Sequence, residues 1–130
     1  MRISSARTYR LRYPVHKPFA NACTWNPTRS AVLVELTTDN GLSGWGEGIA
    51  VPGEQALHRL LGQDPFATER LARQAVEAGC GFGAWSGVDI ALFDLIGQAT
   101  GRPIHQVLGG AQRDHIPAYA SGLFLYDVDN

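Results

Sequence analysis

Two carboxylates on one predicted helix are the first candidates for chemistry in this sequence. Two aspartates that share a site can exchange a proton or hold a metal ion. Asp89 and Asp94 could do this only if their side chains came together. Because they are five positions apart, they point to opposite flanks of a helix, which favours capping or ion-pairing roles. Glu47, next to a strand glycine, is interpreted as a structural hydrogen-bonding group rather than a ligand.

The thiols, the imidazoles and one glycine-rich run predict no site of their own. Cys23 and Cys80 form no C-x-x-C motif, so we expect two unpaired thiols rather than a zinc site or a disulfide framework. The GCGFG run at residues 79–83 lacks the preceding strand and the Lys-Ser/Thr ending of a phosphate-binding loop, and is interpreted as a connection into a helix. No metal-binding spacing is found among the histidines His16, His58, His105 and His115.

The charge balance excludes several classes of function. The chain has 130 residues, with 11 Lys+Arg, 12 Asp+Glu and a net charge of −1. It shows no basic stripe of the kind that nucleic-acid-binding and membrane-surface proteins use. No apolar run approaches the roughly 20 residues of a membrane-spanning helix, and no signal-peptide core follows Met1. We expect one soluble, cytoplasmic domain that binds neither nucleic acid nor membrane.

The first half of the chain is typical of an antiparallel sheet of about three strands. Residues 30–38 predict a strand that enters a tight turn at Asp39-Asn40-Gly41, and residues 42–49 supply its partner. The glycines at positions 44, 46 and 48 share one face, which predicts the close approach of another element. An earlier strand, residues 3–13, alternates apolar and charged positions, and its packed face is predicted to hold Ile3, Tyr9, Leu11 and Tyr13.

A long segment separates the first two predicted strands. Residues 14–29 include three prolines and several turn formers, which predicts a loop, and loops of this length are usually functional or disordered. Phe19 and Trp25 argue against plain disorder, because a large ring in water gains little unless it packs or meets a ligand.

The second half of the chain is typical of helices. Asp64 before Pro65 predicts the start of one helix, and Gly79 predicts its end. The SGVD run at residues 86–89 resembles a capping box and predicts the start of a second helix, which ends near Gly101. The apolar face of the first helix is predicted to hold Leu71, Ala75 and Val76.

The second predicted helix has two apolar faces. Ile90, Phe93 and Gly97 lie roughly opposite a larger apolar face. A surface helix needs only one apolar stripe, so the second face predicts burial between two layers, of which the sheet is one. The larger face is predicted to hold Val88, Ala91, Leu92, Leu95, Ile96 and Ala99.

Several motifs follow one another in a specific order. They are DNG at residues 39–41, GWGE at 44–47, LGQDPF at 61–66, VDIALFDLIGQ at 88–98, GRPI at 101–104, LGG at 108–110 and RDHIPAYASG at 113–122. Over nearly its whole length, the chain thereby resembles the N-terminal domain of mandelate racemase and muconate lactonizing enzymes, a branch of the enolase superfamily.

This resemblance implies an α+β capping domain that covers a modified (β/α) barrel. We expect residues 1–112 to form the capping domain and residues 113–130 to begin a truncated barrel domain, with its first strand at 116–122. A barrel needs roughly 250 residues, so the missing barrel, or a separate chain that carries it, is the expected partner and would cover the second helix face. The resemblance is also compatible with a homo-oligomer.

The resemblance places the chemistry in the barrel. The family's shared step removes the proton α to a carboxylate, such as that of a sugar acid, with Mg²⁺ stabilising the enediolate. Lys17 is the only lysine here and lies in the predicted loop, not on a barrel strand. The resemblance therefore implies no catalytic residue, no metal ligand and no cofactor in this chain, which we expect to be non-catalytic alone.

The resemblance assigns the capping domain a role in enclosing substrate. It implies that loops at residues 19–26 and 49–54 touch the distal part of the substrate. An aromatic wall excludes water, and a lysine or an asparagine can bind a hydroxyl or a carboxylate. The first contacts expected are Lys17, Phe19, Asn21 and Trp25.

One alternative is a non-enzymatic small-molecule or protein-interaction module with the same α+β fold. Its exposed helix face would then dock a partner chain. Racemases, cycloisomerases and dehydratases share the N-terminal motifs, so the reaction class and the acid are left open.

Overall fold

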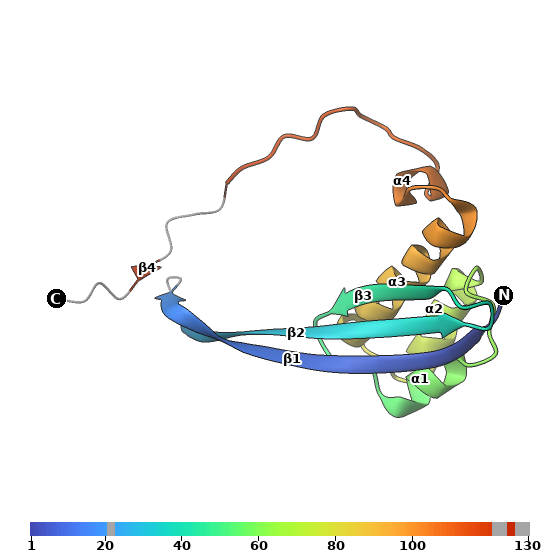
Figure 1. Ribbon diagram of the computed structural model, residues 1–130, viewed down its shortest axis with the longest axis horizontal. Coiled ribbons are helices and arrows are strands. Elements are labelled where there is room, and N and C mark those ends of the chain that lie inside the picture. The colour runs from blue at the N-terminus through green and yellow to red at the C-terminus, as the bar shows by residue number, and fades with distance from the viewer. Residues whose placement is uncertain (21–22, 121–124, 127–130) are drawn as a thin grey trace.

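The chain folds into one antiparallel sheet and a group of helices, and the computed structural model describes residues 1–20, 23–120 and 125–126 (Figure 1). The sheet has the strand order β3-β2-β1-β4. Its strands are β1 (Ile3–Ala20), β2 (Trp25–Thr38), β3 (Ser43–Gly48) and the short β4 (Leu125–Tyr126). The helices are α1 (Glu54–Leu60), α2 (Thr68–Glu77), α3 (Phe82–Thr100) and α4 (Ile104–Val107). The predicted α+β class, a three-stranded antiparallel sheet followed by helices, is confirmed.

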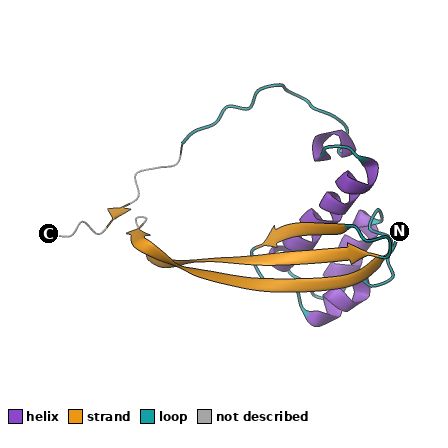
Figure 2. Cartoon of the chain, in the orientation of Figure 1, coloured by secondary structure: helices purple, strands orange, loops and turns teal. Residues whose placement is uncertain are grey.

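The helices gather at the end of the sheet that holds the N-terminus, and β1 and β2 extend well beyond them (Figure 2). α3 packs against β2 and β3, and α1 and α2 complete the layer. Burial of the apolar side chains from both layers removes them from water and stabilises the fold. The buried cluster consists of Ile3, Val34, Leu36, Leu60, Leu71, Val88, Ala91, Leu92 and Leu95.

Residues 14–29 differ most from the sequence-based expectation. β1 and β2 pair antiparallel from Pro14 with Thr28 to Ala20 with Trp25, so the predicted loop is wrong over most of this stretch. Among the described residues, no strand pairs with the other side of β1 around Pro14, so a proline there interrupts no second ladder of hydrogen bonds. The pairing is irregular between Pro14 and Phe19, where the other proline of β1 lies.

The predicted packed face of β1 is also wrong after its first residues. Ile3 is buried, but the pairing shifts just after it, and Ala6 is the next side chain to pack on the core. An extra residue in one strand exchanges the two faces of everything that follows. Tyr9, Leu11 and Tyr13 consequently lie on the face away from the helices.

The turn between β2 and β3 follows the prediction. The Thr38 amide donates to the Leu42 carbonyl at 2.9 Å, and the Gly41 amide donates to the Thr38 carbonyl at 3.0 Å. Gly41 has a φ of +86°, which favours glycine. The Asn40 side chain accepts a hydrogen bond from the Thr38 hydroxyl at 2.6 Å and fixes the turn further.

The three glycines of β3 allow α3 to approach the sheet closely, as predicted. A Cβ on Gly44 would lie 2.6 Å from Leu95 Cγ, and one on Gly46 would lie 2.7 Å from the Ala91 amide nitrogen. Such separations are shorter than van der Waals contact, so side chains there would force the layers apart. Gly48 is buried against Gly87 in the same way.

Both predicted helix starts are displaced. Asp64 Oδ1 accepts the Phe66 amide at 3.0 Å in a turn, and α2 begins only at Thr68. α3 begins at Phe82, and the Ser86 hydroxyl donates to the Gly83 carbonyl at 3.0 Å inside the helix instead of capping it. Both side chains thus bond to nearby backbone groups instead of capping a helix. Sequence spacing alone does not distinguish these two arrangements.

The helix ends agree better with the prediction. Gly79, with a φ of +75°, follows α2, and Gly101, with a φ of +64°, is the left-handed C-cap of α3. Leu71 and Ala75 are buried as predicted, whereas Val76 is 71% exposed because it lies on the solvent side of α2. Ala99 is also exposed, beyond the part of α3 that the sheet covers.

In its described part, the chain after α4 adopts little regular structure. Residues 111–120 contain neither helix nor strand, so the strand expected at 116–122 is absent over 116–120, and 121–122 lie outside the described residues. A barrel strand needs neighbouring strands to satisfy its backbone groups, and the part of the chain that the structure describes places none beside residues 116–120. It arches away from the body and returns toward the far end of the hairpin (Figure 1).

Candidate functional site

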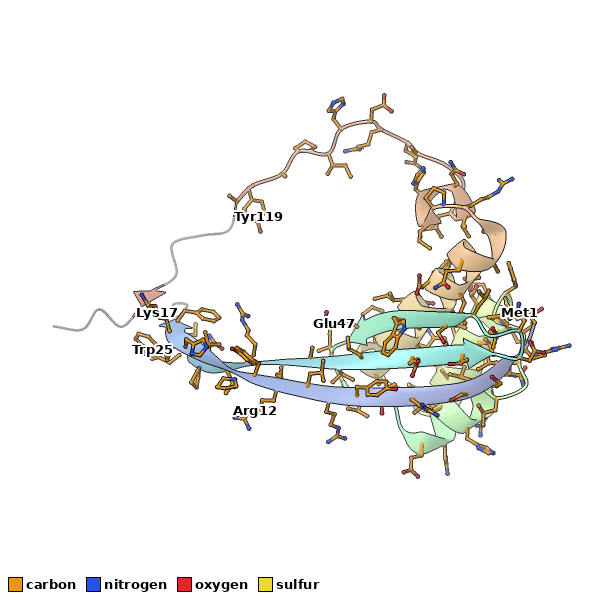
Figure 3. All side chains as sticks on the ribbon, viewed as in Figure 1. Met1, Arg12, Lys17, Trp25, Glu47 and Tyr119 are labelled. Atoms are coloured by element: carbon orange, nitrogen blue, oxygen red, sulfur yellow. The ribbon has the colours of Figure 1, made fainter. Side chains whose placement is uncertain are left out.

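The end of the β1–β2 hairpin holds the predicted substrate contacts. We define the hairpin arm as residues 11–20 and 25–31, which extend past the last β2–β3 pair, Val32 with Gly48. Lys17 and Trp25 both lie at its far end (Figure 3). Lys17 is exposed, and Trp25 is 52% exposed. Asn21, from the same predicted set, lies outside the described residues.

Phe19 has different surroundings from the other two. Its ring is only 8% exposed, and the guanidinium carbon of Arg29 lies 4.2 Å from the ring centroid. A guanidinium above an aromatic face is a favourable cation–π arrangement. In this structure Phe19 therefore packs within the hairpin arm, and Lys17 and Trp25 offer the accessible groups.

Sequence reasoning missed Arg29 as part of this region. The signal that could have found it is the distribution of charge, because the basic residues are concentrated before the first acidic one, Glu35. Those that precede it are Arg2, Arg7, Arg10, Arg12, Lys17 and Arg29. Three of them, Arg12, Lys17 and Arg29, lie in the hairpin arm, which contains no Asp or Glu and is therefore cationic. A cationic arm favours an anionic ligand at its end.

The C-terminal segment reaches the hairpin arm. β4 pairs antiparallel with the end of β1, through Phe19 with Tyr126 and Ala20 with Leu125. Elsewhere on the arm, the Tyr13 hydroxyl lies 3.2 Å from His16 Nε2. Leu125 and Tyr126 therefore lie beside Phe19, one of the predicted substrate contacts.

The second predicted contact loop follows β3. The amides of Ile49 and Ala50 both donate to the Gly83 carbonyl, at 3.1 and 3.0 Å, and tie this segment to the start of α3. Ile49 is 83% exposed and Phe82, at the first turn of α3, is 84% exposed. Phe82 was missed by sequence reasoning, which placed it in a connecting loop.

A groove runs along the second apolar face of α3. It has a volume of about 360 Å³ and is lined by Trp45, Asp89, Ile90, Phe93, Asp94 and Ile104. Ile90 is 50% exposed and Phe93 is half-buried. Gly97 is covered, because a Cβ there would meet the Arg102 carbonyl oxygen at 3.2 Å. The described chain thus closes the α4 end of this face and leaves the rest open.

Asp94 ties α3 to the edge of the sheet. Its Oδ2 accepts the Trp45 amide at 2.8 Å and a hydrogen bond from the Gln98 side chain at 3.1 Å. Gln98 Nε2 also donates to the Ser43 carbonyl at 2.8 Å. The expected helix-capping or ion-pairing role is corrected, because Asp94 binds a strand amide and supports the free edge of β3.

Asp89 lies on the other side of the groove and has a perturbed carboxyl group. Burial raises the pKa of Asp89 above its ordinary value, the neighbouring negative charge of Glu69 raises it further, and a hydrogen bond with the Trp85 side chain opposes both. The two aspartates thus have separate partners. Burial also raises the pKa of the Cys80 thiol, which disfavours its reactive thiolate form.

Glu47 is exposed on β3, opposite Leu33 in the register. Its structural hydrogen bond stays a prediction.

Within residues 1–20, 23–120 and 125–126, no three His, Cys, Asp or Glu side chains come together to hold a metal ion. None of the helices in the described part of the chain combines the length and apolar character needed to span a bilayer.

Comparison with known proteins identifies the domain. The model of the mandelate racemase / muconate lactonizing enzyme N-terminal domain matches residues 4–109. D-galactarolactone cycloisomerase of Agrobacterium fabrum is 37% identical over 98% of this chain and 37% of its own length. D-galactonate dehydratase of Klebsiella pneumoniae is 37% identical over 75% of this chain and 29% of its own length. The chain thus spans about a third of the length of these relatives.

Solved structures give the same fold. A member of the enolase superfamily from Polaromonas superimposes with a TM-score of 0.79 at 26% identity, over 94% of this chain and 36% of that chain. A dipeptide epimerase from Enterococcus faecalis, complexed with Mg and the dipeptide L-Leu-L-Tyr, gives a TM-score of 0.72 at 26% identity. That match covers 85% of this chain and 35% of the epimerase.

Proposed function

This chain belongs to the mandelate racemase / muconate lactonizing enzyme family through its N-terminal domain, and on that basis we propose that it caps an enzyme acting on a carboxylate such as a sugar acid. The observation that carries the proposal is the family match over residues 4–109 in a chain about a third as long as its relatives. The reaction proposed is abstraction of the proton α to the carboxylate, assisted by Mg²⁺.

We place the base and the metal ligands in a barrel outside this chain. Mg²⁺ prefers a near-octahedral shell of oxygen ligands, and the described residues bring together no such donor set. The barrel either continues from the C-terminal segment or belongs to a separate chain. The cytoplasmic location predicted from the sequence remains part of this proposal.

The open groove on α3 supports a docking role toward the barrel. Ile90 and Phe93 offer apolar surface there, and Ile49 and Phe82 add two highly exposed side chains at the other end of α3. Covering these side chains would remove apolar area from water at roughly 25 cal/mol per Å². The alternative, a non-enzymatic interaction module, would use the same groove for an unrelated partner chain.

The hairpin arm is the part that we propose to enclose the substrate. Lys17 would bind a distal hydroxyl or carboxylate, and the Trp25 ring would exclude water from the closed site. Arg29 would hold Phe19 and thereby the shape of the arm. Asn21 stays in the proposed set on the sequence alone.

The non-catalytic part of the proposal is tested with the chain itself. The purified protein is incubated with Mg²⁺ in deuterated buffer and a panel of sugar acids that includes D-galactonate, and exchange of the α-proton is followed by NMR. We expect no exchange above the protein-free control. Magnesium-dependent exchange by this chain would overturn its assignment as a non-catalytic domain.

The capping role is tested in a chimera. Residues 1–112 replace the corresponding domain of the Agrobacterium fabrum cycloisomerase, and kcat/KM is measured for D-galactarolactone. We expect an active chimera in which Trp25→Ala and Lys17→Ala each lower kcat/KM by about tenfold, because both would lose contacts to bound substrate.

Matched controls separate this effect from damage to the fold. Phe66→Ala removes an aromatic ring that is 48% exposed but lies before α2, and Arg12→Ala removes a cation nearer the body. Both are expected to stay within about twofold of the parent chimera. An active chimera that Trp25→Ala and Lys17→Ala leave unchanged would contradict the substrate contacts, and an inactive but folded chimera would contradict the capping role.

A further inference from the structure

The groove on α3 combines apolar walls with negative charge. Ile90, Phe93 and Ile104 supply apolar side chains to its lining. Among the described residues, the only ionisable groups that line it are Asp89 and Asp94, so no basic side chain faces the groove. Ile90 and Ile104 are 50% and 38% exposed, and part of this apolar surface therefore still meets water. A partner that covers the groove has to match both an apolar surface and negative charge.

The two aspartates differ in how far their charge is compensated. Asp94 Oδ2 accepts two hydrogen bonds from amide groups, at 2.8 and 3.1 Å. Asp89 is half-buried, and the one charged group of the described chain that acts on it is Glu69 of α2, which has the same sign. The Trp85 side chain forms a hydrogen bond with Asp89 but carries no charge. Asp89 therefore lies at the groove without a cationic partner in the described chain.

The position of Phe93 indicates which cation the groove favours. Residues four apart are neighbours on one side of a helix, and Asp89 and Phe93 both line the groove. A group bound to Asp89 is therefore within reach of the Phe93 ring. A guanidinium pairs with a carboxylate through two parallel hydrogen bonds and packs on aromatic faces, whereas an ammonium is more strongly hydrated. Arginine thus fits these two residues better than lysine.

We propose that the groove on α3 receives an apolar segment of the barrel that carries one arginine, and that the guanidinium of this arginine pairs with Asp89. The inference rests on the proposed capping role and adds the chemistry of the covering segment. A carboxylate that loses its water on docking needs an opposite charge, because an unpaired buried charge is strongly unfavourable. The groove volume of about 360 Å³ is near the lower end of ligand-sized pockets, roughly 300–1,000 Å³, so it accepts a few side chains.

The first test measures cation recognition by the 130-residue chain itself, with n-butylguanidinium as the probe. This ion joins a guanidinium to a short apolar chain. The matched control is n-butylurea, which has nearly the same shape and no charge. NMR signals of the Asp89 carboxyl carbon and the Ile90 methyl groups should shift with n-butylguanidinium, with a dissociation constant in the low millimolar range. We expect n-butylurea to bind about fivefold more weakly.

Two variants show whether Asp89 supplies the charge. Asp89→Asn should weaken binding of n-butylguanidinium to about the level of n-butylurea, because it removes the charge with which the probe pairs. Glu77→Gln removes an exposed carboxylate of α2 that does not line the groove, and binding should be unchanged. Equal affinities for the two probes, or an Asp89→Asn variant that binds like the parent, would overturn the pairing of a cation with Asp89.

The second test examines the docked state in the chimera that carries residues 1–112 on the barrel of the Agrobacterium fabrum cycloisomerase. The measurement is the time in which half of the activity is lost at a fixed urea concentration. Asp89→Asn should shorten this time by about tenfold, because it breaks the ion pair with the barrel. In the 130-residue chain alone the same substitution should instead stabilise the fold, since it removes an unpaired charge. Glu77→Gln is again the control and should change neither.

The outcomes separate this inference from the capping role. An active chimera that Asp89→Asn leaves unchanged or makes more stable would overturn the arginine and leave the capping role intact. An inactive but folded chimera would contradict the capping role and this inference with it. Self-association of the 130-residue chain that n-butylguanidinium reverses would assign the groove to a second copy, and would likewise overturn the barrel segment as its occupant.

Discussion

The body and the hairpin arm are built from the same two strands, but they differ in what surrounds those strands. In the body, Val34 and Leu36 of β2 are fully buried beneath α3. Farther along the same hairpin, Leu11 and Trp25 are about half exposed. A two-stranded ribbon is only marginally stable alone, whereas a sheet packed on helices is stable. The body therefore holds the fold together, and the arm depends on it.

This difference explains where function can change without loss of the fold. Arm residues are held by one neighbouring strand, by the Arg29–Phe19 contact and by the β4 pairing at the far end. Substitutions of its exposed side chains, such as Lys17 and Trp25, remove little buried area, so they cost little stability and can alter what the arm contacts. In the body, a single added methyl group meets backbone atoms of the next layer.

The largest loss of stability in the body is expected from a substitution at Gly46. Gly46→Ala would place its Cβ against the Gly87 carbonyl oxygen and 2.7 Å from the Ala91 amide nitrogen. Because neither backbone atom can move without displacing α3, we expect a loss of more than about 3 kcal/mol in the free energy of unfolding. Urea unfolding followed by circular dichroism measures this loss.

Gly53→Ala is the matched control for that substitution. An added Cβ at Gly53 meets nothing within 4 Å, and its φ of −64° suits any residue. Alanine there should be neutral or stabilise by up to about 1 kcal/mol, because it restricts the unfolded chain. Equal stability of both variants and the parent would contradict the tight contact between β3 and α3.

The edge of the body gives a smaller effect. Asp94→Ala removes the acceptor for the Trp45 amide and for the Gln98 side chain, and we expect a loss of about 1–2 kcal/mol. Asp94→Asn keeps one acceptor oxygen and should recover part of this loss. Hydrogen exchange should show faster exchange of the Trp45 amide in Asp94→Ala. An unchanged exchange rate there would contradict the edge contact.

Features of the fold that depend on nearby residues were predicted from the sequence, and features that depend on the pairing of distant segments were not. The Asp39-Asn40-Gly41 turn, the glycines of β3 and the end of α3 at Gly101 were predicted because each depends on the conformation or size of nearby residues. The exchange of faces in β1 was not predicted, because it depends on one extra residue in the pairing of two strands. The helix starts were displaced because local turns used the capping side chains.

The surroundings of the candidate contacts were predicted only in part, and their role in binding stays a prediction. Lys17 and Trp25 were expected in a loop, whereas they lie on β1 and β2, with both side chains accessible at the end of the arm. The burial of Phe19 beneath Arg29 could not be predicted, because it depends on strand pairing through a proline-containing stretch interpreted as a loop. The exposure of Phe82 followed from the early start of α3.

The smallest predicted effect concerns Asp89, at the boundary between the body and its open groove. Burial raises the pKa of Asp89 in the folded state, so between the unfolded and folded pKa values the folded chain binds more protons. The free energy of unfolding therefore falls as pH rises through that interval, and the full penalty is present above the folded pKa. Asp89→Asn should remove this penalty. The free energy of unfolding should then rise by less than about 1 kcal/mol at pH 7, because the carboxyl group remains partly solvated.

The pH dependence and a second variant show whether burial is the cause. The gain from Asp89→Asn should disappear as pH falls below the ordinary aspartate pKa of about 4. Glu69→Gln should raise the free energy of unfolding at pH 7 by less than Asp89→Asn does. In a protein that already carries Asp89→Asn it should add almost nothing, because the two carboxylates interact. Urea unfolding across this pH range measures both effects. A loss of stability in Asp89→Asn at pH 7 would mean that the Trp85 hydrogen bond outweighs burial, and the groove beside Asp89 would then favour the ionised carboxylate.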